Sequence, residues 1–101
     1  MYKPAEDSEL MAEFLPIIIQ KERPARFLDM GCGSGIQSRV AIKAGIKKES
    51  ILAVDIDSDA LKETGKLGVQ TRKSDLFENI KEKFDLIALN PPYLPEHERE
   101  K

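Results

Sequence analysis

The 101-residue sequence has little cysteine, no excess of positive charge and no long apolar run. Its single cysteine, Cys32, excludes an internal disulfide and a cysteine-based zinc cluster, so no metal site is expected. Such sparing use of cysteine is typical of a reducing, cytoplasmic compartment. Apolar runs such as Ile17 to Ile19, with Phe14 and Leu15 just before Pro16, are far too short to span a bilayer, and no secretory signal pattern opens the sequence.

Positive charge is balanced by negative charge along the chain. There are 16 Lys and Arg residues against 18 Asp and Glu residues, which gives a formal net charge of −2. A protein that binds nucleic acid by itself usually carries a basic surface, so nucleic acid is not an expected partner. The length suits one domain, with residues 1–24 as an N-terminal helical segment, 25–95 as a βαβ core and 96–101 as a polar tail.

Short apolar runs alternate with helical patterns, which predicts βαβ units and a parallel sheet. Strands are expected at 26–30, 51–55, 69–72 and 84–89, and helices at 8–20, 36–44 and 58–67. In the first helix, Leu10, Phe14 and Ile17 or Ile18 share one face, and Asp7 or Ser8 is the expected N-cap. Pro16 is expected to kink or shorten this helix.

The last expected strand is apolar on both faces, as interior strands of parallel sheets are. Only a Pro-containing turn and a polar tail follow it, so the strand is expected at an edge with unpaired backbone groups. The chain is therefore predicted to form the first part of a longer sheet, either truncated or completed by another chain. Self-association through this edge is a further expectation.

A glycine-rich loop follows the first expected strand in the stretch from Asp29 to Gly35 (DMGCGSG). Its glycines allow positive φ angles and close approach of a ligand to the start of the next helix. A dinucleotide fingerprint would place its third glycine at Ile36, which this spacing does not do. The alternative is a tight turn with incidental glycines. If the loop holds a nucleotide or nucleoside cofactor, the residues predicted to form this part of its site are Asp29, Gly31, Cys32, Gly33 and Gly35.

Asp55 ends the second expected strand, about 20 residues beyond the loop, where an acidic residue accepts hydrogen bonds from ribose hydroxyls. Ile56 would then lie against an adenine ring. Asp57 is better explained as a helix cap. A lone aspartate at a strand end is also a common solvated turn residue, and the preceding glycine loop favours the ligand-binding interpretation of Asp55.

The stretch Asn90-Pro91-Pro92-Tyr93 follows the fourth expected strand. An amide or aromatic amine nitrogen is a poor nucleophile, because its lone pair is delocalised. The side-chain oxygen of Asn90 and the carbonyl of Pro91 can accept hydrogen bonds from such a nitrogen, while the prolines stiffen the loop and Tyr93 stacks on the planar group. Catalysis would then rest on positioning and electrostatics. The alternative is a Pro-rich turn.

Together the glycine loop, Asp55 and the Asn-Pro-Pro-Tyr stretch resemble the class I S-adenosylmethionine (SAM)-dependent methyltransferases that modify amide or exocyclic amino nitrogens. This resemblance implies an α/β, Rossmann-like fold, of which the chain is the N-terminal part. It implies about four parallel strands in the order 3-2-1-4, flanked by helices. In the resembled families an acidic residue after the third strand meets adenine, which points to Asp75 and the amide of Leu76. An N-cap for a short helix at 76–81 explains Asp75 equally well.

The opening stretch from Tyr2 to Ser8 resembles that of the HemK-like (PrmC-type) protein glutamine methyltransferases, especially the archaeal and eukaryotic type. This resemblance implies methylation of the glutamine in the Gly-Gly-Gln loop of translation release factors. It places Glu6, Asp7 and Ser8 near the methionine end of SAM. It also implies a small zinc-binding activator subunit that pairs with the edge of the third strand.

Members of that family are roughly twice as long and continue into three more strands, consistent with ordinary domain sizes. Two alternatives therefore stay open. One is an adenine or guanine amino-methyltransferase acting on nucleic acid, because the Asn-Pro-Pro-Tyr chemistry serves that reaction too. The other is a truncated, non-catalytic fragment that binds SAM.

Overall fold

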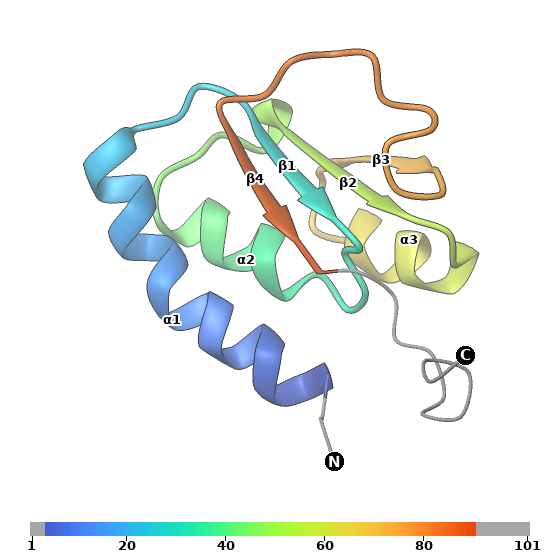
Figure 1. Ribbon diagram of the computed structural model, residues 1–101, viewed down its shortest axis with the longest axis horizontal. Coiled ribbons are helices and arrows are strands. Elements are labelled where there is room, and N and C mark those ends of the chain that lie inside the picture. The colour runs from blue at the N-terminus through green and yellow to red at the C-terminus, as the bar shows by residue number, and fades with distance from the viewer. Residues whose placement is uncertain (1–3, 91–101) are drawn as a thin grey trace, which may run out of the picture.

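A computed structural model describes the chain from Pro4 to Asn90, with side chains described from Leu10 onward. The elements, in chain order, are α1 (Pro4–Glu22), β1 (Phe27–Met30), α2 (Ile36–Lys43), the 3-10 turn η1 (Lys48–Ser50), β2 (Ile51–Asp55), α3 (Ser58–Gly65), β3 (Gln70–Lys73) and β4 (Leu86–Leu89). The four strands form one sheet in the order β3-β2-β1-β4 (Figure 1). Every neighbouring pair is parallel, which confirms the predicted α/β fold and strand order.

The strand register brings the carboxyl ends of all four strands to the same edge. Met30 pairs with Val54 on one side and with Leu89 on the other, and Asp55 pairs with Lys73. Ligands of open parallel sheets bind outside the carboxyl ends of the strands. The segments that follow β1, β2, β3 and β4 are thus the ones placed to build a site.

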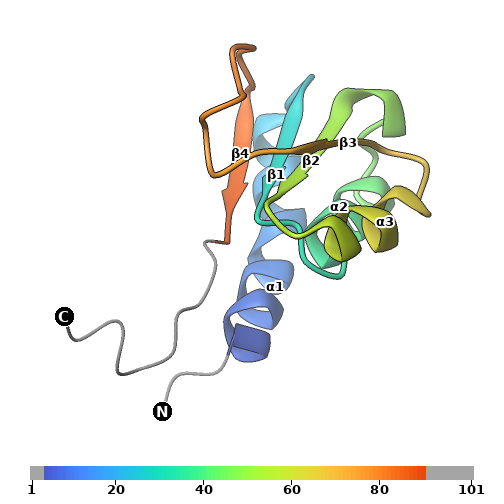
Figure 2. The ribbon, with the colours of Figure 1, turned by 90° about the vertical axis from the view of Figure 1, so that its right-hand side faces the viewer.

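Two apolar layers lie on opposite faces of the sheet. On one face, residues of α1 and α2 pack with β1, β2 and β4, and the helices gather on this side in Figure 2. This layer includes Leu15, Ile19, Phe27, Ala41, Ile51, Ala53 and Ala88. On the other face, Leu28, Met30, Leu52 and Val54 are covered in part by Ile80 and Phe84 from the segment between β3 and β4. Because both faces are covered, the central strands β1 and β2 are apolar almost throughout.

Helix α1 differs from its prediction in two ways. It begins at Pro4, so Asp7 and Ser8 lie inside the helix and are not its N-cap. Proline is well accepted in a first helical turn, because the missing N–H has no partner there. The helix also continues through Pro16 to Glu22, so the predicted shortening is wrong. Packing of one face on the core outweighs the loss of one helical hydrogen bond.

The face of α1 that packs on the core is carried by Met11, Leu15 and Ile19. The face noted from the sequence is exposed instead: Leu10, Phe14, Ile17 and Ile18 expose between 40% and 64% of their surface. An exposed apolar helix face of this size is typical of a contact surface. Helix α1 therefore has two apolar faces, and only one of them is covered by the described residues.

Strand β4 lies at the edge of the described sheet, as predicted. In register, Ile87 stands beside Leu28 and Leu89 beside Met30, on the face away from the helices. Ile87 and Leu89 nevertheless expose 44% and 45% of their surface. The second apolar layer thus extends over β4 without cover from the described residues.

The segment between β3 and β4 is held in place by polar contacts. Arg72 forms a two-pronged ion pair with Glu82, with N–O distances of 2.9 and 2.6 Å. The pair lowers the pKa of Glu82 to about 2, chiefly through its hydrogen bonds with Arg72. The Asp85 carboxylate accepts hydrogen bonds from the Ala25 and Arg26 amides at 3.0 and 2.8 Å. These contacts fix the segment that carries Ile80 and Phe84 over the second apolar layer.

Candidate cofactor site

The glycine loop after β1 is anchored by backbone contacts. Gly31, Gly33 and Gly35 all have positive φ angles, of 77°, 52° and 89°. The amides of Gly31 and Cys32 both donate to the carbonyl of Val54, at 2.7 and 2.9 Å. A side chain at Gly31 would meet the backbone of Asn90, whereas nothing lies within 4 Å of a Cβ built at Gly33. The loop is therefore tightly packed at its first glycine and open at its second.

Asp55 fastens this loop from the end of β2. One carboxylate oxygen accepts a hydrogen bond from the Gly33 amide at 2.9 Å, and the other accepts one from the Asp57 amide at 2.9 Å. A carboxylate offers about four acceptor sites, so further donors such as ribose hydroxyls can still be accepted. Asp57 caps α3 as predicted, with its side chain accepting from the Asp59 amide at 3.0 Å.

Asp29 is fully buried beneath the loop. Its Oδ2 accepts hydrogen bonds from the amide and the hydroxyl of Ser38, at 3.0 and 2.7 Å, and so ties β1 to α2. Its Oδ1 has no hydrogen-bond partner among the described residues. Burial raises the pKa of this carboxyl to about 6, against the opposing effect of the Ser38 hydrogen bonds. A buried acid with a spare acceptor is a group that a cationic ligand would stabilise in its ionised form.

Cys32 is buried within the loop, where its small side chain fills space. Burial raises the pKa of its thiol to about 12, although hydrogen bonding with Thr64 acts in the opposite direction. Since the thiolate is the reactive form, this thiol is unreactive near neutral pH.

Two supporting residues, Thr64 and Ser38, are not among the site residues predicted from the sequence. Thr64 is fully buried on α3, and its hydroxyl donates to the carbonyl of Gly33 at 3.1 Å. Ser38, on α2, completes the contact with Asp29. The sequence signal that could have identified them is a hydroxyl residue on the apolar face of each helix, because a buried hydroxyl needs a specific hydrogen-bond partner.

The turn after β3 lies beside the end of β2. The amide of Ser74 donates to the Asp55 carbonyl at 3.1 Å, and its hydroxyl donates to the Leu76 carbonyl at 2.8 Å. Leu76 has a positive φ of 54°, and residues 75–79 form a bend and turns instead of a helix. The alternative explanation of Asp75, as the cap of a short helix at 76–81, is therefore wrong. Ile56 and Leu76 are both exposed at this end of the sheet, 46% and 40%, as an adenine-binding role would require.

Asn90 directly follows β4, and its amide donates to the carbonyl of Met30 at 2.8 Å. This bond holds Asn90 against the start of the glycine loop. Pro91, Pro92 and Tyr93 lie outside the described residues, as do the side chains of Glu6, Asp7 and Ser8. The roles predicted for these six residues stay predictions.

The residues present fit SAM. The open space at Gly33, the remaining acceptor capacity of Asp55 and the spare buried oxygen of Asp29 lie around one loop. Asp55 would hold the ribose, and the loop would face the methionine part. When bound, SAM supplies an electrophilic methyl group.

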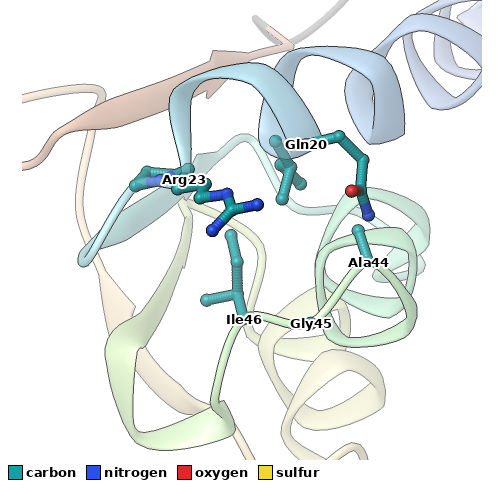
Figure 3. A pocket seen from close by; sticks show the side chains of 7 residues that line it. Gln20, Arg23, Ala44, Gly45 and Ile46 are labelled. Carbon is teal, nitrogen blue, oxygen red and sulfur yellow. The ribbon is translucent and has the colours of Figure 1, made fainter.

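A separate cavity of about 290 Å³ lies between the carboxyl ends of α1 and α2 (Figure 3). It is lined in part by Gln20, Arg23, Ala44, Gly45 and Ile46. The glycine loop precedes α2, so this cavity lies at the opposite end of that helix and does not belong to the cofactor site. Within residues 4–90, no helix is long and apolar enough to cross a membrane.

The parallel sheet in the order β3-β2-β1-β4 and the glycine loop after β1 are those of a class I methyltransferase. Comparison with known proteins agrees, because the family model of the methyltransferase small domain matches residues 6–101. The chain belongs to this family, whose cofactor is SAM. Among solved structures, a ribosomal protein L11 methylase from Lactobacillus delbrueckii subsp. bulgaricus is similar with a TM-score of 0.67 and 27% identity, over 80% of this chain and 44% of that one. An S-adenosylhomocysteine-bound methyltransferase from Podospora anserina shares the fold, with a TM-score of 0.66 and 20% identity over 87% of this chain and 44% of that one.

Two curated relatives are glutamine methyltransferases by name. A candidate protein N5-glutamine methyltransferase from Methanocaldococcus jannaschii is 43% identical over all of this chain and 51% of its own length. A release factor glutamine methyltransferase from Borreliella burgdorferi is 40% identical over 96% of this chain and 36% of its own length. The chain thus spans about half, or less, of the length of these relatives.

Proposed function

We propose that the chain forms the cofactor-binding half of a SAM-dependent methyltransferase that acts on the side-chain amide of a glutamine in a translation release factor. The observation that carries this proposal is the position of Asn90. Its backbone is fixed to Met30 and lies against Gly31, so the residue that would hold the acceptor nitrogen stands at the start of the cofactor loop.

This juxtaposition suits methyl transfer to a poor nucleophile. The acceptor amide would donate its hydrogens to the side-chain oxygen of Asn90 and to the carbonyl of Pro91. Those acceptors would favour the tetrahedral nitrogen that forms as the bond to the methyl carbon is made. Bound SAM would supply the methyl group, with S-adenosylhomocysteine as the leaving group that keeps the electron pair of the broken bond, and the surplus proton of the acceptor nitrogen would pass to solvent. Positioning at the end of a rigid strand would supply much of the rate enhancement.

A methyl-transfer assay with radiolabelled SAM, carried out on the chain completed by the C-terminal half of a longer relative, tests the proposal. The acceptors to compare are a release factor, the same factor with its Gly-Gly-Gln glutamine changed to alanine, ribosomal protein L11 and ribosomal RNA. We expect label only in the unmodified release factor. Label in RNA would favour the amino-methyltransferase alternative, and label in L11 would assign a different protein substrate.

Asn90→Ala supplies the matching test on the enzyme. Because Asn90 would act on the acceptor nitrogen in the transition state, we expect a loss of kcat of about 100-fold or more, with SAM affinity changed by less than about threefold. An equal loss in kcat and in SAM affinity would make Asn90 chiefly a cofactor residue.

We also propose that activity requires polypeptide beyond the described sheet. The open edge of β4, the exposed Ile87 and Leu89 and the exposed face of α1 all support this. The occupant would be the C-terminal part of the fold, which the longer relatives have room for, supplied in the same chain or separately. Activity that appears only after the C-terminal half of a relative is added would support this proposal.

The opposite edge of the sheet suits the zinc-binding activator subunit. Strand β3 is the other edge strand, and its Gln70, Thr71 and Lys73 are exposed. A partner strand could pair with these free backbone groups. Co-purification with such a subunit, lost after Thr71→Pro, would support pairing at β3, since proline removes an edge N–H donor.

A further inference from the structure

Side chains from two different elements hold the cofactor loop, and one of them has no assigned role. Asp55 reaches the loop from β2, and Thr64 reaches it from α3. Thr64 is fully buried, and its hydroxyl donates to the Gly33 carbonyl at 3.1 Å. A Cβ built at Gly35 would lie only 3.0 Å from the same hydroxyl oxygen, so the loop and α3 are packed together.

Gly33 is therefore fixed on both sides. Asp55 accepts from its amide at 2.9 Å, and Thr64 donates to its carbonyl. No peptide bond among the described residues is cis, so the peptide joining Gly33 to Ser34 is trans. In a planar trans peptide the C=O and the N–H point in opposite directions. Since the Gly33 carbonyl points at α3, the Ser34 N–H points away from α3.

The direction of the Ser34 N–H matters because this group lies next to the start of α2. Ser34 directly precedes Gly35, the N-cap of α2, and Gly35 makes no side-chain cap. The start of a helix favours a negative group, since its N–H groups and its dipole are both directed there. The only anionic group of SAM or S-adenosylhomocysteine is the carboxylate of its amino-acid part.

We propose that Thr64 is a positioning residue of the cofactor site, which orients the Gly33–Ser34 peptide so that its N–H faces the carboxylate of the cofactor. Thr64 does not contact the cofactor itself. It acts by holding the Gly33 carbonyl toward α3, without which the peptide can rotate and the N–H loses its direction. The proposal rests on the SAM site and deepens it, because it concerns the amino-acid end of the ligand.

Two ligands separate this role from a merely structural one. S-adenosylhomocysteine carries the amino-acid part, whereas 5′-methylthioadenosine keeps the adenine, ribose and sulfur but lacks the carboxylate. Thr64→Val preserves the shape of the side chain and removes the hydroxyl. Thr64→Ser restores the hydroxyl, and Thr71→Val makes the same chemical change at an exposed position on β3.

Calorimetric titration of the unmodified chain and the three variants with both ligands gives the test. For Thr64→Val we expect about a 10-fold loss of affinity for S-adenosylhomocysteine and less than about a twofold loss for 5′-methylthioadenosine. Thr64→Ser should recover the affinity, and Thr71→Val should match the unmodified chain. Equal weakening of both ligands by Thr64→Val, or no weakening of either, would overturn the proposal. If Thr64→Val lowers the thermal stability, the titrations are made below its unfolding temperature, where retained binding of 5′-methylthioadenosine shows that the site is folded. Cofactor binding does not depend on the methyl acceptor, so this result is separable from the release-factor proposal.

Discussion

A Cβ atom placed on Gly31 would overlap the backbone carbonyl oxygen of Asn90 and lie 2.8 Å from its carbonyl carbon. These two residues are 59 positions apart and belong to two separate motifs, the glycine loop and the Asn-Pro-Pro-Tyr stretch. Their contact joins the cofactor loop to the residue proposed to hold the methyl acceptor. The absence of a side chain at Gly31 is thus a packing requirement as well as a conformational one.

Gly31→Ala should lower the free energy of unfolding by about 2 kcal/mol or more beyond the effect of Gly45→Ala. Gly45 is the matched control, because its φ is also positive at 111° but nothing lies within 4 Å of its Cβ. Both variants place alanine at a positive φ, and only Gly31→Ala adds the clash with Asn90. Urea denaturation measures the difference, and equal destabilisation would show that the loop and β4 can separate at little cost.

Asp55→Ala should weaken S-adenosylhomocysteine by about 1.5–3 kcal/mol, the range for a charged hydrogen-bonding group. The structure adds a second reason for this loss, since the same carboxylate holds the Gly33 amide. Asp57→Ala is the control: it removes a helix cap two residues away and should reduce stability by about 1 kcal/mol with little effect on affinity. Calorimetry that finds unchanged binding for Asp55→Ala would refute the ribose assignment.

Asp29 should make stability depend on pH between about 4 and 6. Its pKa is raised by burial from 3.8 to about 6, so the folded state binds a proton more tightly than the unfolded state does. The stability that this group contributes is fully present below pH 4 and is lost as the pH rises through about 6. The full effect is about 3 kcal/mol.

Asp29→Asn removes this titration and keeps an acceptor for Ser38. The stability of the unmodified chain minus that of Asp29→Asn should therefore fall as the pH rises from 4 to 7. The ion pair of Glu82 has the opposite sign and loses stability only toward pH 2, and it is common to both proteins. A difference that stays flat across this range in denaturation curves would mean that Asp29 has an ordinary pKa in the folded chain.

The strands and their order were predictable because periodicity and motif order are local signals. Strand β2 matches its prediction from Ile51 to Asp55, and α2 ends at Lys43, one residue short of the expected end. The orientation of α1 was not predictable, since Leu10 and Phe14 form as good an apolar face as Leu15 and Ile19. Which face packs is decided by the rest of the fold.

The residues of the candidate site also divide into those that could be predicted from local sequence and those that depend on tertiary packing. Asp55 and the glycines could be identified because their spacing is set by the loop itself. The hold of Thr64 on Gly33 could not, because it joins residues 31 positions apart through tertiary packing. Likewise, the turn at Leu76 with its positive φ was mistaken for a possible helix start, since the buried hydroxyl of Ser74 that stabilises it has no sequence signature.

The open edge of β4 gives the last prediction. Backbone groups on this edge have no partner strand among the described residues, and Ile87 and Leu89 leave an apolar strip beside them. Exposed apolar edge strands recruit other strands. We expect the 101-residue chain to self-associate in sedimentation velocity experiments and to lack methyl transfer to a release factor.

Ile87→Lys should shift the chain toward monomer, because a charge on an edge strand discourages strand addition. Thr71→Lys places the same charge on β3, the opposite edge, and should leave the association unchanged. Adding the C-terminal half of a relative should have two effects together: it should convert the chain to a one-to-one complex and make it active. Association that Thr71→Lys abolishes and Ile87→Lys does not would move the interface to β3. A monomeric and fully active 101-residue chain would contradict the prediction altogether, because four strands would then suffice for both the sheet and the chemistry.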